Sequence, residues 1–367
     1  MFRSTSVLAI LVAMSAPALA ADYNEWGEFE DAAPDFRNSY SIEPKDWTEL
    51  GDATDPMTFE IGARYWYSMG SASFSSLTGG LSSTDETHFG ELHLRVNDHV
   101  TNTFAKANVG YSIASSGSYT STGPVGDFSD AITSGHIGYA GADLGWNIIG
   151  DNNGSGAGVL VGYQYWNDAL HTGRNNFTTL SGGETLTYTP DGHYVIPGDS
   201  APNDVTIHAL RLGVQGKAKL GDFFDIQAEV AAVPYASVSG TVGVDDPTFS
   251  TAEYVGPAQF PYGGMNGNIS SMRASPTTIE GWGYGAQAEA WLGMHPTENL
   301  TFRLGGRASY LQGTADATYT RVFITDPGPP GGPYTDDPVV TSTGVIETAN
   351  PFAMIRYGLM GEFTYSF

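Results

Sequence analysis

The sequence predicts an all-β protein, a closed antiparallel transmembrane β-barrel of about ten strands with long external loops and short periplasmic turns. The chain ends on "MIRYGLMGEFTYSF", in which every second residue back from Phe367 is apolar, aromatic or Gly. Similar alternation recurs along a chain that has 47 Gly, 20 Tyr and 18 Phe but no Cys. After residue 20, no apolar run approaches the roughly 18 residues that a membrane-spanning helix needs. Since only helices and closed barrels satisfy all backbone hydrogen bonds in lipid, repeated amphipathic strands favour a barrel.

The first 20 residues, "MFRSTSVLAILVAMSAPALA", have the pattern of a cleaved signal peptide. A basic residue, Arg3, precedes an apolar run that ends in the small-x-small sequence Ala18-Leu19-Ala20. We expect the mature protein to begin at Ala21 and to reside in the outer membrane of a Gram-negative bacterium. Residues 21–55 contain 11 acidic and two basic residues and are expected to form an acidic periplasmic N-terminal extension. Partial order on the barrel rim and a disordered tail both remain open for this extension.

The barrel domain is expected to span residues 56–367, and its first five strands place apolar residues on one parity and polar residues on the other. In the first of them, Ile61 and Tyr65 alternate with Glu60 and Arg64. These five predicted strands are 57–69, 88–97, 103–113, 136–148 and 158–168.

The last five predicted strands follow the same rule, as Leu210 and Leu212 on either side of Arg211 illustrate. They are 206–218, 223–233, 281–294, 300–311 and 354–367. The connections alternate between short (98–102, 149–157, 219–222 and 295–299) and long (70–87, 114–135, 169–205, 234–280 and 312–352).

The number of connections agrees with a barrel that has both ends in the periplasm, since ten strands then need five external loops and four turns. A water-soluble β-sandwich is the alternative, because it also contains alternating strands. It would not require an apolar face that runs to the last residue.

The inward parity of the predicted strands collects more than half of the 15 Lys and Arg residues of the chain. Eight bases and seven acids would leave the lumen wall nearly neutral and able to form a filled lumen charge network, with a charge-lined channel as the alternative. On neighbouring strands, Glu289 is expected to reach Arg303. The predicted network is Glu60, Arg64, Glu91, Arg95, Lys106, Asp143, Arg211, Lys217, Asp225, Glu229, Glu289, Arg303, Arg307, Arg356 and Glu362.

The final strand carries the aromatic pattern that the barrel-assembly machinery reads, and its predicted C-terminal insertion signal is Tyr357, Phe363, Tyr365 and Phe367. The other expected partners are outer-membrane lipid and lipopolysaccharide, together with an unidentified surface ligand. The net charge of −25 argues against nucleic acid. We expect no cofactor and no metal.

Ten strands, a C-terminal Phe and this order of loops resemble the omptins, a family of outer-membrane proteases, and also ten-stranded adhesins. The stretches "VGYQYWND", "RLGVQGKAKLGD" and "GGRASYL" resemble proteobacterial outer-membrane barrels of this size. The resemblance would imply an acidic pair and an Asp–His pair near the external mouth. The loop that would carry the His, 234–280, contains none, so the omptin catalytic set does not carry over.

A second possible site is the rim where strands 158–168 and 206–218 meet. Asp168, His171, Asp204 and His208 could act there as general acids and bases or bind a metal. The alternative is that they are solvated residues at the base of a loop.

The sequence thus favours a non-enzymatic outer-membrane barrel with a charged, largely filled lumen and acidic surface loops, acting in surface binding or envelope structure. A narrow, porin-like diffusion channel is the first alternative, and an omptin-like hydrolase is the second.

Overall fold

The computed structural model describes residues 57–76, 79–123, 126–150, 154–172, 203–221, 223–242, 260–262, 265–267, 271–273, 277–325 and 339–367. The predicted signal peptide and the acidic segment 21–55 lie outside these residues.

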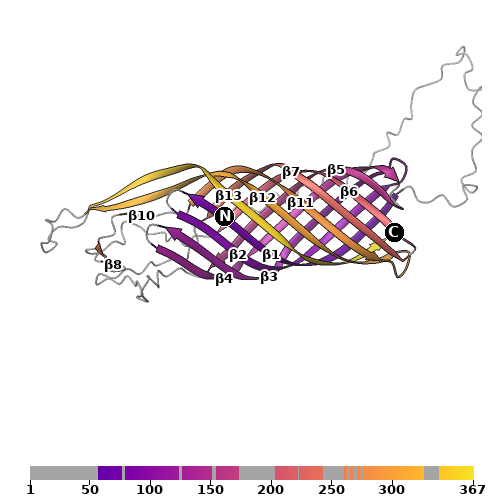
Figure 1. Cartoon of the computed structure of the whole chain (residues 1–367), viewed down its shortest axis with the longest axis horizontal. Helices are drawn as coiled ribbons and strands as arrows, with labels where there is room; N and C mark the ends of the chain where they lie inside the picture. The colour runs from indigo at the N-terminus through magenta and orange to yellow at the C-terminus, as the bar shows by residue number, and fades with distance from the viewer. Residues whose placement is uncertain are drawn as a thin grey trace, which may run out of the picture. The chain divides into compact units, whose positions relative to one another are not determined.

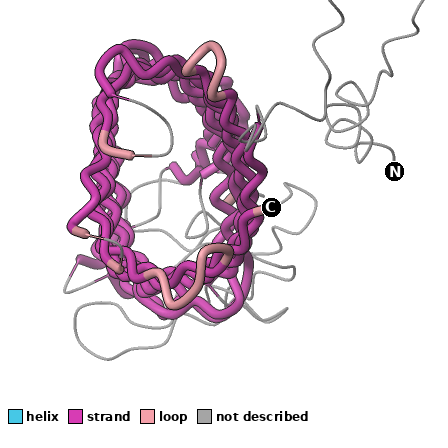
Figure 2. Tube along the Cα trace, turned by 90° about the vertical axis from the view of Figure 1, so that its right-hand side faces the viewer, coloured by secondary structure: helices cyan, strands magenta, loops and turns pink. Residues whose placement is uncertain are grey.

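Ten long antiparallel strands form a closed ring, which confirms the predicted fold class (Figure 1, Figure 2). Each long strand pairs with its sequence neighbour, and the last strand pairs with both its predecessor and the first, so the sheet has no free long edge. The long strands are β1 (Met57–Ser76), β2 (Gly79–Asp98), β3 (Thr103–Gly123), β4 (Gly126–Gly150), β5 (Gly156–Thr172), β6 (Asp204–Leu220), β7 (Phe224–Val242), β11 (Thr277–Met294), β12 (Leu300–Thr325) and β13 (Val339–Ser366). Three short strands, β8 (Phe260–Tyr262), β9 (Met265–Gly267) and β10 (Ser271–Arg273), precede β11.

The ring closes where the two ends of the barrel sequence meet. The backbone N–H of Phe59 donates to the carbonyl of Phe367, and the N–H of Phe367 donates back, both at 2.9 Å. The two rings stack with centroids 5.8 Å apart. The terminal aromatic residue therefore belongs to the ladder that joins β13 to β1.

The strands extend well beyond their predicted ends, and three of the predicted long loops are wrong; within 312–352, β12 continues to Thr325 and β13 begins at Val339. Residues 70–87 and 114–135 are mostly strand, because β1, β2, β3 and β4 continue into hairpins. The parts of these four strands that lie beyond their predicted ends are rich in Ser, Thr and Gly on both faces. Without an apolar outer face, these parts lack the alternation by which the strands were predicted. We call this end of the barrel the hairpin end and the end that holds residues 57, 295–299 and 367 the turn end.

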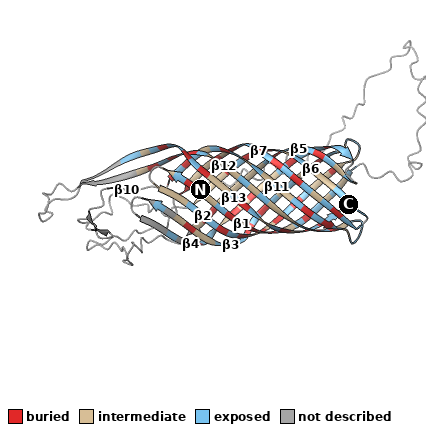
Figure 3. Cartoon of the chain, in the orientation of Figure 1, coloured by how far each residue is buried: buried red, intermediate tan, exposed pale blue. Residues whose placement is uncertain are grey.

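The outer face of the barrel is apolar between two aromatic belts. On β1, Phe59 lies in the belt near the turn end and Tyr65 and Tyr67 in the belt toward the hairpin end. Phe59 and Tyr67 are eight residues apart. At the usual rise per residue and tilt of barrel strands, this separation is roughly 20 Å along the barrel axis, close to the roughly 25 Å apolar band of membrane barrels. Exposed and buried residues alternate along the strands between the belts (Figure 3). The barrel is therefore built to span a membrane. Among the described residues, no helix is long and apolar enough to do so.

The short turn after β2 shows how the turn end is held together. The N–H of Val100 and the hydroxyl of Thr101 both donate to the carboxylate of Asp98, at 2.8 Å each. These hydrogen bonds, the Thr101 hydroxyl first, lower the pKa of Asp98 below its usual value. The turn is an Asx-type structure that is also tied to the wall, since His99 Nε2 lies 2.6 Å from the hydroxyl of Thr58 and the carbonyl of Asn102 accepts from the N–H of Asn147 at 2.8 Å.

Candidate functional site: the lumen

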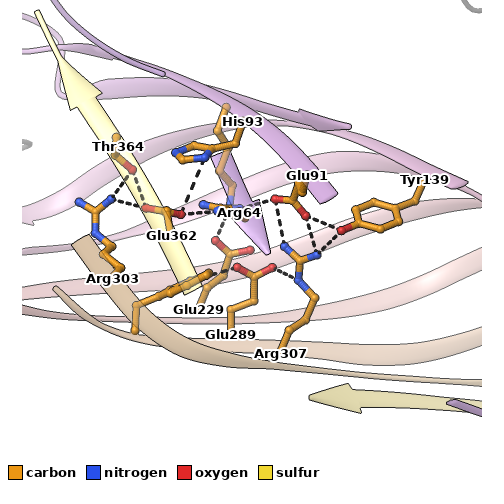
Figure 4. A network of polar contacts seen from close by, with 12 residues as sticks. Arg64, Glu91, His93, Tyr139, Glu229, Glu289, Arg303, Arg307, Glu362 and Thr364 are labelled. Atoms are coloured by element: carbon orange, nitrogen blue, oxygen red, sulfur yellow. Dashed lines mark hydrogen bonds and ion pairs between the residues drawn. The ribbon is translucent and has the colours of Figure 1, made fainter. Parts of the chain in front are cut away.

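Arg307 on β12 is the centre of the largest ion-pair cluster inside the barrel (Figure 4). Its Nε donates to Glu289 Oε1 at 2.6 Å, and its Nη1 donates to Glu91 Oε2 at 2.9 Å. The hydroxyl of Tyr139 donates to the same Glu91 oxygen at 2.6 Å. Arg64 Nη1 donates to the other oxygen of Glu91 at 2.7 Å. Glu91 thus has two arginines and a tyrosine as partners, and its carboxylate is fully compensated.

The same cluster continues toward the turn end through Glu362 on β13. Arg64 Nε donates to one oxygen of Glu362, and Arg303 Nη1 donates to the other at 2.6 Å. The hydroxyl of Thr364 also donates to Glu362, at 2.8 Å. His93 Nδ1 lies 3.8 Å from the carboxylate (Figure 4). Arginines and carboxylates therefore alternate without a gap from Glu289 to Arg303.

A second cluster crosses the barrel from β3 to β7, which are separated by three strands. Lys106 on β3 pairs with Glu229 on β7 and lies 3.3 Å from Asp143. Arg211 donates to Asp143 and to Glu229, at 2.8 Å in each case. The Lys106–Glu229 ion pair therefore joins two strands that are not neighbours, and all four residues line the same cavity of the lumen.

Apart from Arg356, the remaining charged residues of the predicted network line the lumen near the turn end. Asp225 accepts from His295 Nε2 at 2.7 Å and lies 3.8 Å from Lys217. Arg95 and Glu60 are joined through Asn97, which accepts from Arg95 Nε at 2.8 Å and donates to Glu60 at 3.1 Å.

The strand register decides which charges pair, and it shows that the predicted Glu289–Arg303 pair is wrong. The turn between β11 and β12 sets Glu289 opposite Arg307, whereas Arg303 faces Gly293. Arg303 instead pairs with Glu362 on its other neighbour, β13. Counting the register outward from the 295–299 turn would have given the correct partner.

Arg356 pairs with a residue that the sequence analysis missed. Its two terminal nitrogens donate to Asp85 at 2.7 and 2.8 Å, and Nη1 also donates to Ser68 at 2.9 Å. Gly70 lies between Arg356 and Asp85 in the register, and a Cβ there would come within 2.4 Å of both side chains. Asp85 shares the inward parity of Glu91, but it fell within the predicted loop 70–87.

Aromatic side chains fill the lumen next to the charged clusters. Trp66 stacks on Phe89 with centroids 4.9 Å apart, and Tyr139 stacks on Trp166 at 5.2 Å. Tyr139 lies over Gly110 of the adjacent strand, where a Cβ would be 2.2 Å from its ring. The glycine therefore lets the phenol lie flat and reach Glu91.

Toward the hairpin end, the lumen wall becomes apolar. This differs from the prediction, which had a charged inner face. The buried residues there come from β1, β6, β7, β11, β12 and β13 and pack as one cluster. On β7 the inward residues beyond Glu229 are all apolar or small, although membrane barrels usually have polar interiors. The sequence signal is "VAAVPYASVSGTV", in which apolar residues occupy both parities. We call this group the apolar lumen cluster: Phe74, Ile207, Ala209, Val233, Ala236, Val238, Val242, Ile279, Ala315, Ala317 and Phe352.

Three cavities follow one another along the lumen. The first, of about 100 Å³, lies among the charged residues, from Glu60 to Arg307. The second, of about 70 Å³, shares Gln164 and Trp166 with the first. The third, of about 80 Å³, borders the apolar lumen cluster. Each cavity shares lining residues with the next, the second and third having Ala72, Asp168 and Met354 in common.

The four residues of the possible rim site do not come together. Asp168 lines the lumen cavities, whereas His208 lies on the outer face, where its Nδ1 is 2.5 Å from the hydroxyl of Tyr163. Asp204 accepts from the amide of Asn167 at 2.6 Å. Among the residues that the structure describes, no three His, Asp or Glu side chains are arranged to hold a metal ion.

Comparisons with known proteins add likeness only at the level of architecture. No protein-family model and no curated protein matches the chain. Among solved structures, the β-domain of the Bordetella autotransporter BrkA is 8% identical with a TM-score of 0.33, covering 85% of this chain and 100% of that chain. An outer membrane channel from Pseudomonas putida F1 is 14% identical with a TM-score of 0.29, covering 86% of this chain and 100% of that one. The P. putida toluene transporter TodX is 11% identical with a TM-score of 0.28, covering 86% and 91%. Likeness of this degree assigns no function.

Proposed function

We propose that this chain is a non-enzymatic barrel of the outer membrane whose lumen is closed by ion pairs, and that it acts in the envelope or by binding at the cell surface. The observation that carries the proposal is the set of contacts between strands that are not neighbours. Lys106 on β3 pairs with Glu229 on β7, and Arg307 on β12 pairs with Glu91 on β2. Contacts of this kind support a closed lumen, because they place paired side chains across the path that a solute would take.

The non-enzymatic part of the proposal is supported by the hydrogen bonds and ion pairs that already occupy the acidic residues of the lumen. The acids Glu91, Asp143 and Glu362 each accept from two or more donors, which leaves them poorly suited to proton transfer. The omptin arrangement would instead need acids and a histidine free at one mouth. A peptide-library assay in lipopolysaccharide is expected to show no cleavage above the background of a denatured sample.

The second candidate function, a narrow diffusion channel, is favoured by the row of three cavities. Modest side-chain movements at Trp166 and Met354 would join spaces of about 100, 70 and 80 Å³. A channel lined first by apolar and then by charged groups would select its solutes by both properties.

Planar-bilayer recording of the purified full-length protein decides between the two functions. If the ion pairs close the lumen, the wild type gives no steady single-channel steps. The double variant Lys106→Ser/Glu229→Ser then admits ions, because it removes the pair that crosses the barrel. Lys219→Ser, an exposed change at the turn end, is the matched control and remains silent.

Steady steps in the wild type that change in size in Arg307→Ala would contradict the proposal. They would make the channel the better assignment, since a lumen residue would then sense the passing ions.

A further inference from the structure

The second and third cavities of the lumen are two parts of one space around Asp168. They share Ala72, Asp168 and Met354 as lining residues, one on each of three strands. Twelve of the other 27 lining residues belong to the apolar lumen cluster or pack against it, and the polar remainder includes Gln164 and the Arg356–Asp85 pair. At about 70 and about 80 Å³, the two parts together match the roughly 150 Å³ apolar cavity that admits a benzene molecule.

Asp168 is the one acidic residue of this space that has no basic partner among the described residues. Its carboxylate accepts one weak hydrogen bond, from the N–H of Leu170 at 3.4 Å. Arg356, which lines the same space, is instead bound in a two-pronged pair to Asp85. A carboxylate in apolar surroundings is costly unless a cation or hydrogen-bond donors accompany it.

Two other polar groups of the space are unsatisfied, the indole N–H of Trp166 and the side-chain oxygen of Asn203. Both atoms are buried and have no hydrogen-bond partner within the described part of the chain. The Trp166 ring stacks on Tyr139, with centroids 5.2 Å apart, and is therefore held in place. Phe74, Tyr119 and Phe352 add aromatic walls on the other side of Asp168.

A carboxylate among aromatic rings is the arrangement that recognises organic ammonium ions, through an ion pair and cation–π contacts. We propose that the space around Asp168 binds a small organic ammonium ion, with an apolar body about the size of one ring and with its charged nitrogen on Asp168. This inference adds a ligand site to the closed barrel proposed above. A neutral molecule would leave the carboxylate uncompensated, and an anion would be repelled by it.

The test uses three probes of nearly equal size: benzylammonium, benzyl alcohol and benzoate. Their binding to the detergent-solubilised full chain is measured by calorimetry and by the fluorescence of its Trp residues. The wild type is expected to bind benzylammonium about tenfold more tightly than benzyl alcohol, since a hydrogen bond to a charged group contributes roughly that factor. Benzoate is expected not to bind.

Two variants and one control assign the effect to this space. Asp168→Asn is expected to remove the preference for benzylammonium while benzyl alcohol still binds. Ala72→Leu fills the shared wall and weakens both ligands. Glu280→Gln, an exposed acidic residue on β11, leaves both affinities unchanged. Heat-modifiable migration in a denaturing gel verifies that each variant is folded.

Three results would overturn the inference: no binding of any probe to the folded wild type, equal affinities for the ammonium and the alcohol, or an unchanged preference in Asp168→Asn. None of them depends on conductance. Single-channel steps in the same preparation would therefore contradict the closed lumen without bearing on the ligand site.

Discussion

Arg307 on β12 and Glu91 on β2 are joined by a 2.9 Å contact that spans the two strands between them, β13 and β1. Neighbouring strands pair side chains locally, but this contact ties together parts of the wall that share no backbone hydrogen bond. The pair therefore places two charged side chains inside the lumen, away from the backbone of either strand.

Neutralising Glu91 should strongly destabilise the barrel. Glu91→Gln leaves Arg64 and Arg307 without their shared negative charge, and one amide oxygen remains for the three donors that share two oxygens in the wild type. Breaking a buried pair typically costs about 3–5 kcal/mol. Urea unfolding in detergent measures this loss, and the exposed control Glu280→Gln should stay within about 0.5 kcal/mol of the wild type. A loss of about 1 kcal/mol or less in the free energy of unfolding for Glu91→Gln would mean that water screens the remaining charges of Arg64 and Arg307, as in an open pore.

The partner of Glu289 can be identified with a double-mutant cycle. Glu289→Gln and Arg307→Met should show a coupling energy of about 1 kcal/mol or more, because their charges lie 2.6 Å apart. The same cycle with Arg303→Met should be additive within about 0.5 kcal/mol. Strong coupling to Arg303 would indicate a β11–β12 register different from the observed one.

The membrane depth of the barrel can be tested with two equally exposed residues on one strand. Leu359 is 68% exposed and lies between the aromatic belts, whereas Ile346 is 69% exposed and lies far toward the hairpin end of β13. Leu359→Arg should cost about 2–4 kcal/mol in lipid vesicles because it places a charge in the apolar band. Ile346→Arg should cost about 0.5 kcal/mol or less. Equal costs would argue that both positions face water.

The last residue should contribute to assembly through both its backbone and its ring. Deleting Phe367 removes two hydrogen bonds to Phe59 and the ring stack, whereas Phe367→Ala keeps the hydrogen bonds. The fraction of folded, heat-modifiable protein in the membrane should therefore fall in Phe367→Ala and fall further in the deletion. Ser366→Ala, whose side chain lies on the other face, serves as the control. Wild-type levels for both Phe367 variants would contradict an insertion signal at this end.

The membrane-spanning part of each strand could be predicted from the sequence, because lipid on one side and lumen on the other impose alternation. The outward positions of Tyr357, Phe363, Tyr365 and Phe367 follow from this rule, and all four are exposed. Beyond the belts the outer face no longer meets lipid, so the pattern disappears and the hairpins of β1 to β4 were predicted as loops. Asp85 was missed for this reason.

The partners inside the lumen were harder to predict than the strands. Parity shows that Glu289 faces inward, but only the register selects Arg307 over Arg303. The Lys106–Glu229 pair depends on the curvature of the whole ring, which no local pattern encodes. The apolar lumen cluster was overlooked because both faces of β7 are apolar toward its end, and parity alone cannot tell which of two apolar faces lies inside.

The seam between β1 and β13, where Glu60 pairs in register with Ser366, has a consequence for how the chain folds. These positions lie at nearly opposite ends of the barrel sequence, which gives the seam the highest contact order of any strand pair in the ring. The long loop that it closes adds an entropic cost before any seam hydrogen bond forms. Until the last residues arrive, the chain is an open sheet with two unpaired edges, and unpaired edges promote aggregation. The edge of β1 must therefore be shielded until β13 is available to pair with it.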